Sequence, residues 1–151
     1  MNVLLVCDFP DPRRDPDFYP DTDLMGMREA VRGLCLACQQ QRHQLLITPQ
    51  PAVSLLVQSL LREEPGLLEA EDDFLRYEDP RRAVFIGGME AEIKTFHRLR
   101  AAGIPCLPVA STGLAPARML KSAAGEFHST VRELLHKPYV YPVLFEALLS
   151  R

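Results

Sequence analysis

The sequence has no long apolar run and no excess of basic residues. Its apolar stretches are far shorter than the roughly 20 residues that a membrane-spanning helix needs. The first seven residues, MNVLLVC, lack the basic start of a signal peptide. We therefore expect a cytoplasmic protein that does not engage a membrane. The net charge is −3 and Lys and Arg are scattered or adjacent to Asp and Glu, which argues against nucleic acid as a partner.

Cysteine is also scarce, with 4 in the chain. In a cytoplasmic protein these are reduced thiols. Cys35 and Cys38 form a C-x-x-C pair, but a structural zinc site needs about four ligands and the sequence has no second pair. A redox pair normally begins a helix, whereas this one falls late on an apolar helical stripe. We predict small core residues here.

The loop over residues 8–23 is rich in proline and aspartate. The prolines exclude regular structure, and the acidic residues could suggest a bound cation. The spacing of an EF-hand is absent, however. We therefore expect no metal and no cofactor.

What the sequence does contain is sufficient for one domain over residues 1–151, with 47% apolar and 25% charged residues. Apolar runs predict strands over 2–7, 43–48, 83–86 and 104–109. Helical spacing predicts helices over 24–41, 51–64, 89–102, 113–124, 130–137 and 141–149. Residues 63–82 show no clear strand. This alternation predicts a Rossmann-like α/β fold, a parallel sheet of about four to five strands with helices on both faces.

In such sheets ligands bind beyond the carboxyl ends of the strands, where the strand order switches. Two turns lie at predicted strand ends and precede predicted helices, Gly87-Gly88-Met89 and Ser111-Thr112-Gly113. Glycine has no Cβ, so a ligand can approach its main chain closely. The free N–H groups at a helix start favour the binding of an anion. The candidate ligand-binding residues are Cys7, Asp8, Phe9, Gln50, Gly87, Gly88, Met89, Ser111, Thr112 and Gly113. The alternative is that these glycines and caps serve only the fold.

Residues 84–90 (VFIGGME) and 107–113 (LPVASTG) resemble the SLOG superfamily, which joins the SMF/DprA proteins with the LOG enzymes. They look closest to its nucleotide-sensor domains in bacterial conflict systems. Residues 8–16 (DFPDPRRDP) and 27–31 (MREAV) are similar to the family's first loop and helix. The resemblance covers most of the chain. It implies a Rossmann-like sheet and a nucleotide-derived ligand, such as a cyclic nucleotide or an ADP-ribose compound.

The chain also departs from the family. It has Thr-Pro-Gln-Pro at 48–51 where the family tends to carry Gly-Gly-His-Pro, and Leu114 where a second glycine follows Ser-Thr-Gly. The LOG enzymes' Gly-Gly-x-Gly-Thr-x-x-Glu would place its third glycine, threonine and glutamate at Glu90, Ala91 and Lys94. The chain thus resembles a shortened and altered member.

Three functions follow from these observations. The one we favour is a non-catalytic sensor of a nucleotide-derived ligand, acting as a homo-oligomer or with a protein partner. The second is an N-glycosidic enzyme, a nucleotide phosphoribohydrolase or a deoxyribosyltransferase-like protein, with Glu92, Glu90 or Asp8 as acid or nucleophile. The third is a structural subunit whose site has decayed.

Overall fold

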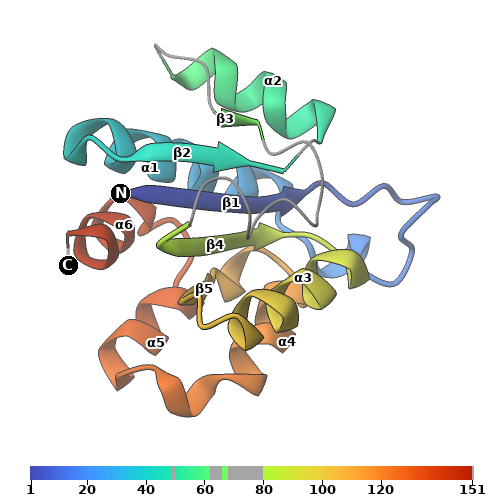
Figure 1. Cartoon of the computed structure of the whole chain (residues 1–151). Helices are drawn as coiled ribbons and strands as arrows, with labels where there is room; N and C mark the ends of the chain where they lie inside the picture. Colours follow the sequence, from blue (N-terminus) through green and yellow to red (C-terminus); the bar gives the residue numbers. More distant parts are fainter. Residues whose placement is uncertain (49, 62–65, 68–79, 151) are drawn as a thin grey trace.

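The computed structural model describes residues 1–48, 50–61, 66–67 and 80–150. Its centre is a five-stranded sheet in the order β3-β2-β1-β4-β5, in which all neighbouring strands run parallel (Figure 1). The strands are β1 (Asn2–Asp8), β2 (Gln44–Ile47), β3 (Gly66–Leu67), β4 (Arg82–Gly87) and β5 (Cys106–Pro108). The predicted Rossmann-like α/β architecture is therefore confirmed.

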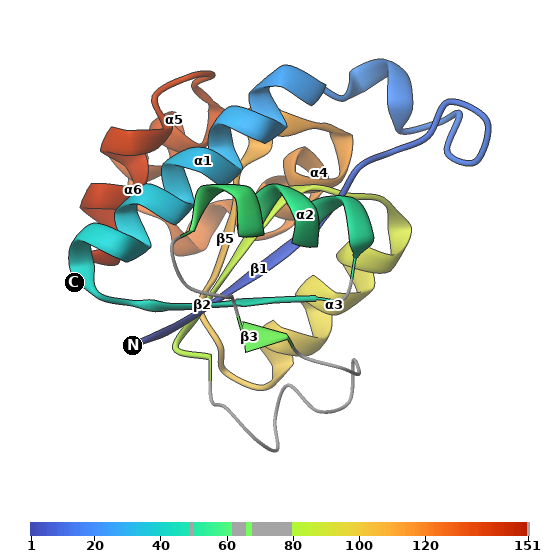
Figure 2. The same cartoon turned by 90° about the horizontal axis from the view of Figure 1, so that it is seen from above.

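Six α-helices accompany the sheet in the described part of the chain. They are α1 (Leu24–Gln41), α2 (Pro51–Leu60), α3 (Glu90–Ala101), α4 (Leu114–Ser122), α5 (Ser129–His136) and α6 (Tyr141–Leu149). Helix α1 lies between α6 and α2 and contacts both (Figure 2). None of the described helices combines the length and apolarity needed to cross a membrane.

Side chains of β1 alternate between two cores, because successive residues of a strand point to opposite faces of a sheet. Val3 and Leu5 pack into the core formed with α1, α2 and α6. Leu4 and Val6 pack into the core formed with α3 and α4, which contains Phe96. Both faces of the sheet are thus covered, as the continuous apolar run of β1 predicts.

The helix starts agree with the sequence in two places. The Asp23 side chain caps α1, because its Oδ1 accepts a hydrogen bond of 2.9 Å from the N–H of Gly26. Pro51 occupies the first turn of α2, where its missing N–H costs no helical hydrogen bond. Aspartate is favoured at the N-cap, as at Asp23, because its short side chain ends in oxygen atoms that accept hydrogen bonds from the first turn of the helix.

Two predictions need correction. Residues 66–67 form β3, which local pattern cannot reveal because it consists of two residues paired with Leu46 and Ile47. Helix α2 ends at Leu60, not at residue 64.

The last two helices have buried and capping residues that depend on packing. His128 caps α5, because its Nδ1 accepts a hydrogen bond from the Thr130 N–H. In α6, Tyr141 and Phe145 are buried, whereas Val143 and Ala147 are exposed. The acidic residues of 63–78 lie outside the described residues.

Candidate functional site

The sheet has its topological switch point at β1. The chain lays β2 and β3 on one side of β1 and then crosses to β4 and β5 on the other side. At the carboxyl ends Asp8 pairs with Gly87, and the Gly88 N–H donates a hydrogen bond of 3.0 Å to the Asp8 carbonyl. Of the predicted site residues, Asp8, Gly87 and Gly88 are therefore brought together where such folds bind ligands.

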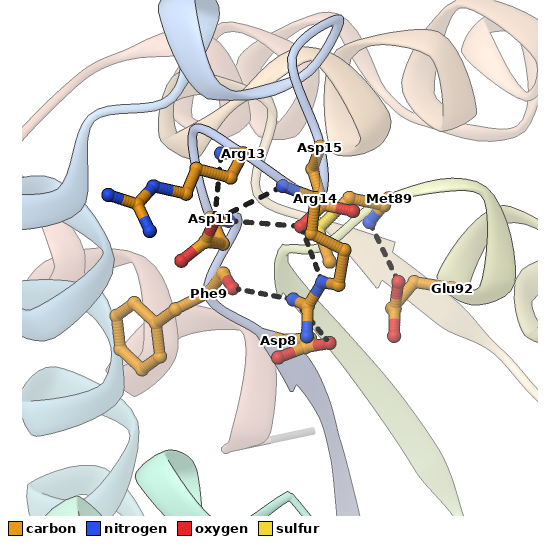
Figure 3. A network of polar contacts seen from close by, with 8 residues as sticks. All are labelled: Asp8, Phe9, Asp11, Arg13, Arg14, Asp15, Met89 and Glu92. Atoms are coloured by element: carbon orange, nitrogen blue, oxygen red, sulfur yellow. Dashed lines mark hydrogen bonds and ion pairs between the residues drawn. The ribbon is translucent and has the colours of Figure 1, made fainter.

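The carboxylate of Asp8 lies at this switch point beside the guanidinium of Arg14. Arg14 Nη2 is 3.7 Å from Asp8 Oδ2, and the two side chains are 60% and 19% exposed, respectively. The same guanidinium donates to Asp15 Oδ2 at 2.8 Å and to the Phe9 carbonyl at 3.2 Å (Figure 3). Arg14 therefore links the start of the loop that follows β1 to Asp15 and holds one positive charge at the site.

The loop is shaped by Asp11. Its Oδ1 accepts from the main-chain N–H of Arg13 at 2.7 Å and of Arg14 at 3.1 Å. The Asp11 N–H in turn donates to Asp15 Oδ2 at 3.0 Å. Aspartate favours such local turns because its short side chain reaches the backbone a few residues on. Sequence reasoning missed Arg14 and Asp15 as site residues, although the Asp-Pro-Arg-Arg-Asp order carried this turn signal.

Glu92 projects from the first turn of α3 and is buried, with 7% of its surface exposed. Its Oε2 accepts a hydrogen bond of 2.7 Å from the Met89 N–H (Figure 3). Burial raises the pKa of the Glu92 carboxyl above its ordinary value, and the negative charges of Asp8 and Asp15 raise it further. Burial also raises the pKa of Asp8, while the charge of Arg14 acts to lower it.

The glycine doublet has the left-handed backbone that glycine accommodates, with φ of 59° at Gly87 and 93° at Gly88. A Cβ on Gly87 would lie 2.2 Å from Met27 Cε, and one on Gly88 would lie 2.6 Å from Glu92 Cγ. The prediction that the missing Cβ atoms of this doublet leave room for a ligand is therefore wrong, because side chains of the protein occupy that space. Helix α1 and the first turn of α3 fill that space.

The N–H groups of the turn are also engaged within the protein. Gly87 N–H donates to Thr112 Oγ1 at 2.9 Å, Gly88 N–H to the Asp8 carbonyl, and Met89 N–H to Glu92. A phosphate bound in a glycine turn is held by such groups when they are free. The turn is consequently a packed link between β4 and α3 and offers no phosphate cradle.

The second turn is packed in a similar way. Thr112 is fully buried, and its hydroxyl donates to the Val109 carbonyl at 2.7 Å while accepting from Gly87. Gly113 has an extended φ of 167°, which any residue can adopt. The Ser111 hydroxyl lies 3.2 Å from the Tyr141 hydroxyl. The Thr112 side chain thus links the second turn to the end of β4.

The remaining predicted residues differ in accessibility. The thiol of Cys7 is buried in the core, and that burial raises its pKa well above the ordinary value. Phe9 is half-buried against the same core. Gln50 is half-buried at the start of α2, and its side chain does not cap that helix. Asp8 is the member whose charged group remains reachable from solvent.

The predicted structural role of the C-x-x-C pair is confirmed. Cys35 and Cys38 lie on the buried face of α1 as free thiols in the core. Burial raises the pKa of each to about 12, so neither is a thiolate at neutral pH. No three His, Cys, Asp or Glu residues within the described ranges come together as a possible metal site.

A separate shallow cavity of about 580 Å³ lies at the other end of the sheet. Its lining comes from the end of α3, the start of β5 and Glu126, and it includes His97, Arg100 and Cys106. None of the predicted site residues lines it. Arg100 forms an ion pair with Glu126 there and stacks over Phe96 at 5.2 Å, so the guanidinium already has partners.

Comparison with known proteins adds no family. No protein-family model matches the chain, and neither curated proteins nor solved structures give a match. The chemistry of the site therefore has to be argued from its own groups. A half-buried carboxylate accepts hydrogen bonds from hydroxyl groups, and an adjacent exposed guanidinium binds an anion.

Proposed function

We propose that the chain binds a nucleotide-derived small molecule at the carboxyl ends of β1 and β4, as a non-catalytic SLOG-like sensor domain. The observation that carries this proposal is the Asp8 carboxylate at the switch point, with the exposed guanidinium of Arg14 3.7 Å away. The resemblance to sensor domains of bacterial conflict systems supports a role in such a system or in signalling, in the cytoplasm.

The packed glycine turn limits how the ligand is held. Because the N–H groups of Gly87, Gly88 and Met89 are already used, the ligand's sugar, not its phosphate, is the part bound against the sheet. Its hydroxyl groups donate to Asp8. A phosphate lies farther out, toward the exposed side chains of Arg13 and Arg14.

Titration calorimetry with ADP-ribose, a cyclic dinucleotide, AMP and adenosine tests the proposal. A hydrogen bond to a charged group contributes about 1.5–3 kcal/mol, so D8N is expected to weaken binding about 10-fold or more. The matched control is E133Q on the exposed surface of α5, which should bind as wild type does. R14A should weaken AMP more than adenosine. The proposal is contradicted if none of the four ligands binds.

A second candidate is the N-glycosidic enzyme, which the presence of two carboxyl groups, Asp8 and Glu92, near the ends of β1 and β4 favours. Glu92 is buried with a raised pKa, and the more accessible Asp8 carries the charge that contributes to that shift. Two carboxyls in unlike environments can divide the roles of acid and nucleophile or base. Release of free base from nucleotides, lost in E92Q, would establish this function, whereas intact nucleotides after prolonged incubation would exclude it for the compounds tried.

The third candidate, a subunit whose site has decayed, is favoured by the filling of the glycine turn with Met27 and Glu92. Such a subunit would neither bind nor cleave the nucleotide panel. Its folded state would nevertheless be intact, which circular dichroism and cooperative unfolding would show. The three functions are therefore separated by one binding and one turnover experiment.

A further inference from the structure

Four of the six exposed large apolar side chains of the described residues belong to helices of one layer of the fold. The six are Met1, Met25, Leu36, Leu55, Tyr139 and Val143. Met25 and Leu36 belong to α1, Leu55 to α2 and Val143 to α6, with exposures from 43% to 69%. None belongs to α3, α4 or α5. Helices α6, α1 and α2 lie side by side (Figure 2), so these four exposed side chains belong to one layer of helices.

The solvent side of α1 has the spacing of a coiled-coil seam. Met25, Glu29, Arg32 and Leu36 follow each other at intervals of four, three and four residues, which is the a/d pattern of a heptad. Arg32 is exposed, Glu29 is half-exposed, and their charged groups are 3.8 Å apart within the chain. The stripe therefore has an apolar residue at each end and opposite charges in its middle.

This stripe is complementary to itself in the antiparallel direction. With a two-fold axis between Ala30 and Val31, Met25 lies opposite Leu36 of the second copy, and Glu29 lies opposite Arg32. Both pairings are favourable, one apolar and one oppositely charged. A two-fold interface requires such a surface, because the same patch serves both partners.

We propose that a second copy of this chain docks antiparallel on α1 and forms a two-fold dimer, with Leu55 and Val143 at the flanks of the interface. Helix α1 has 18 residues, and the flanking helices α2 and α6 widen the contact toward the size that specific interfaces need. The opposite charges of Glu29 and Arg32 favour a second copy over an unrelated helix. In the antiparallel pairing each of these two groups lies opposite its complement in the other copy.

Light scattering coupled to size-exclusion chromatography measures the mass. Wild type should have twice the 17.0 kDa of the single chain. M25E and L36E each place an unpaired charge in the apolar ends and should raise the dimer dissociation constant about 10-fold or more. K94E, on the exposed surface of α3, is the matched control and should remain dimeric.

A charge exchange separates this pairing from a general apolar contact. R32E alone puts like charges opposite each other and should weaken the dimer. The double variant E29R/R32E restores opposite charges across the axis and should restore the dimer. Circular dichroism should show the same helix content in all three proteins, so that a loss of folding is distinguished from a loss of association.

Cross-linking tests the direction of the two helices. Residues 25 and 36 of one helix are about 16 Å apart at 1.5 Å rise per residue, too far for a disulfide within the chain. The double variant M25C/L36C should therefore form an oxidised dimer, and neither single variant should. A monomer at all concentrations up to the millimolar range overturns the proposal. So does a dimer that survives both M25E and L36E, or one that M25C alone cross-links.

Discussion

The buried carboxylate of Glu92 accepts a 2.7 Å hydrogen bond from the main-chain N–H of Met89, and its side chain covers the α-carbon of Gly88. This contact closes the turn between β4 and α3. It also places a carboxyl group of raised pKa beside the Asp8 end of β1. The Glu92 side chain thus occupies a main-chain N–H group of the turn, so that this group is not free to bind a phosphate. It also adds a second carboxyl group to the proposed site at Asp8.

Replacement of Gly88 by alanine should destabilise the fold. The new Cβ would meet Glu92 Cγ at 2.6 Å, and the φ of 93° is unfavourable for alanine. We expect a loss of about 2–4 kcal/mol in the free energy of unfolding, from backbone strain and overpacking together. Urea unfolding measures it. Gly103 is the matched control, because its φ is 78° with no atom within 4 Å of a Cβ; G103A should lose about 1 kcal/mol. Equal losses would contradict the packing at Gly88.

Removal of the Glu92 charge should change how stability depends on pH. The folded protein raises the pKa of this carboxyl above its ordinary value of 4.5, so the folded state binds more protons than the unfolded state as pH rises above that value. Stability contributed through Glu92 therefore falls as pH rises from the unfolded pKa through the folded one. E92Q lacks this fall, and its stability relative to wild type should increase from pH 4 to pH 8. Urea unfolding across that range checks the sign, and a relative decrease would refute the assignment.

The hydroxyl of Thr112 should be required at the second turn. T112V removes the acceptor of the Gly87 N–H and leaves that buried group unpaired, at a cost of about 1–3 kcal/mol. T112S keeps the hydroxyl and loses only a methyl group. Amide hydrogen exchange distinguishes them, since the Gly87 amide should exchange faster in T112V and remain protected in T112S. Unchanged protection in T112V would mean that another group accepts from Gly87.

Loss of the Arg14 guanidinium should act on the charge of Asp8 more than on stability. Exposed ion pairs contribute little to folding, so the unfolding midpoint of R14A should be close to that of wild type. The positive charge lowers the pKa of Asp8, and R14A should consequently raise it. Carboxyl ¹³C NMR titration measures the shift. R32A, which removes an exposed ion pair on α1, is the control and should leave Asp8 unchanged.

The sequence predicts those parts of the fold that depend on local pattern. The apolar run of β1, the Asp23 cap of α1 and the glycines with positive φ at the end of β4 all follow from residue types. Strand β3 does not, because its two residues are defined by pairing with β2. Likewise, an exposed Val143 in α6 follows from how α6 packs against α1, which no single helix pattern specifies.

The candidate site was only partly predictable for the same reason. Asp8 could be placed at a strand end from sequence alone. The filling of the glycine turn depends on Met27, which is distant along the chain, and on the rotamer of Glu92. The position of Arg14 depends on the turn around Asp11. Contacts between distant segments thus decide whether a glycine doublet is a ligand cradle or a packing feature.

The most direct test of the central claim is a ¹H–¹⁵N NMR titration with ADP-ribose. We predict that saturable shift changes cluster at Asp8, Phe9, Arg14 and Gly88, at the carboxyl ends of β1 and β4, and that D8N removes them. Changes confined to the His97, Arg100 and Cys106 cavity at the opposite end of the sheet, or changes that persist in D8N, would contradict the assignment of the site.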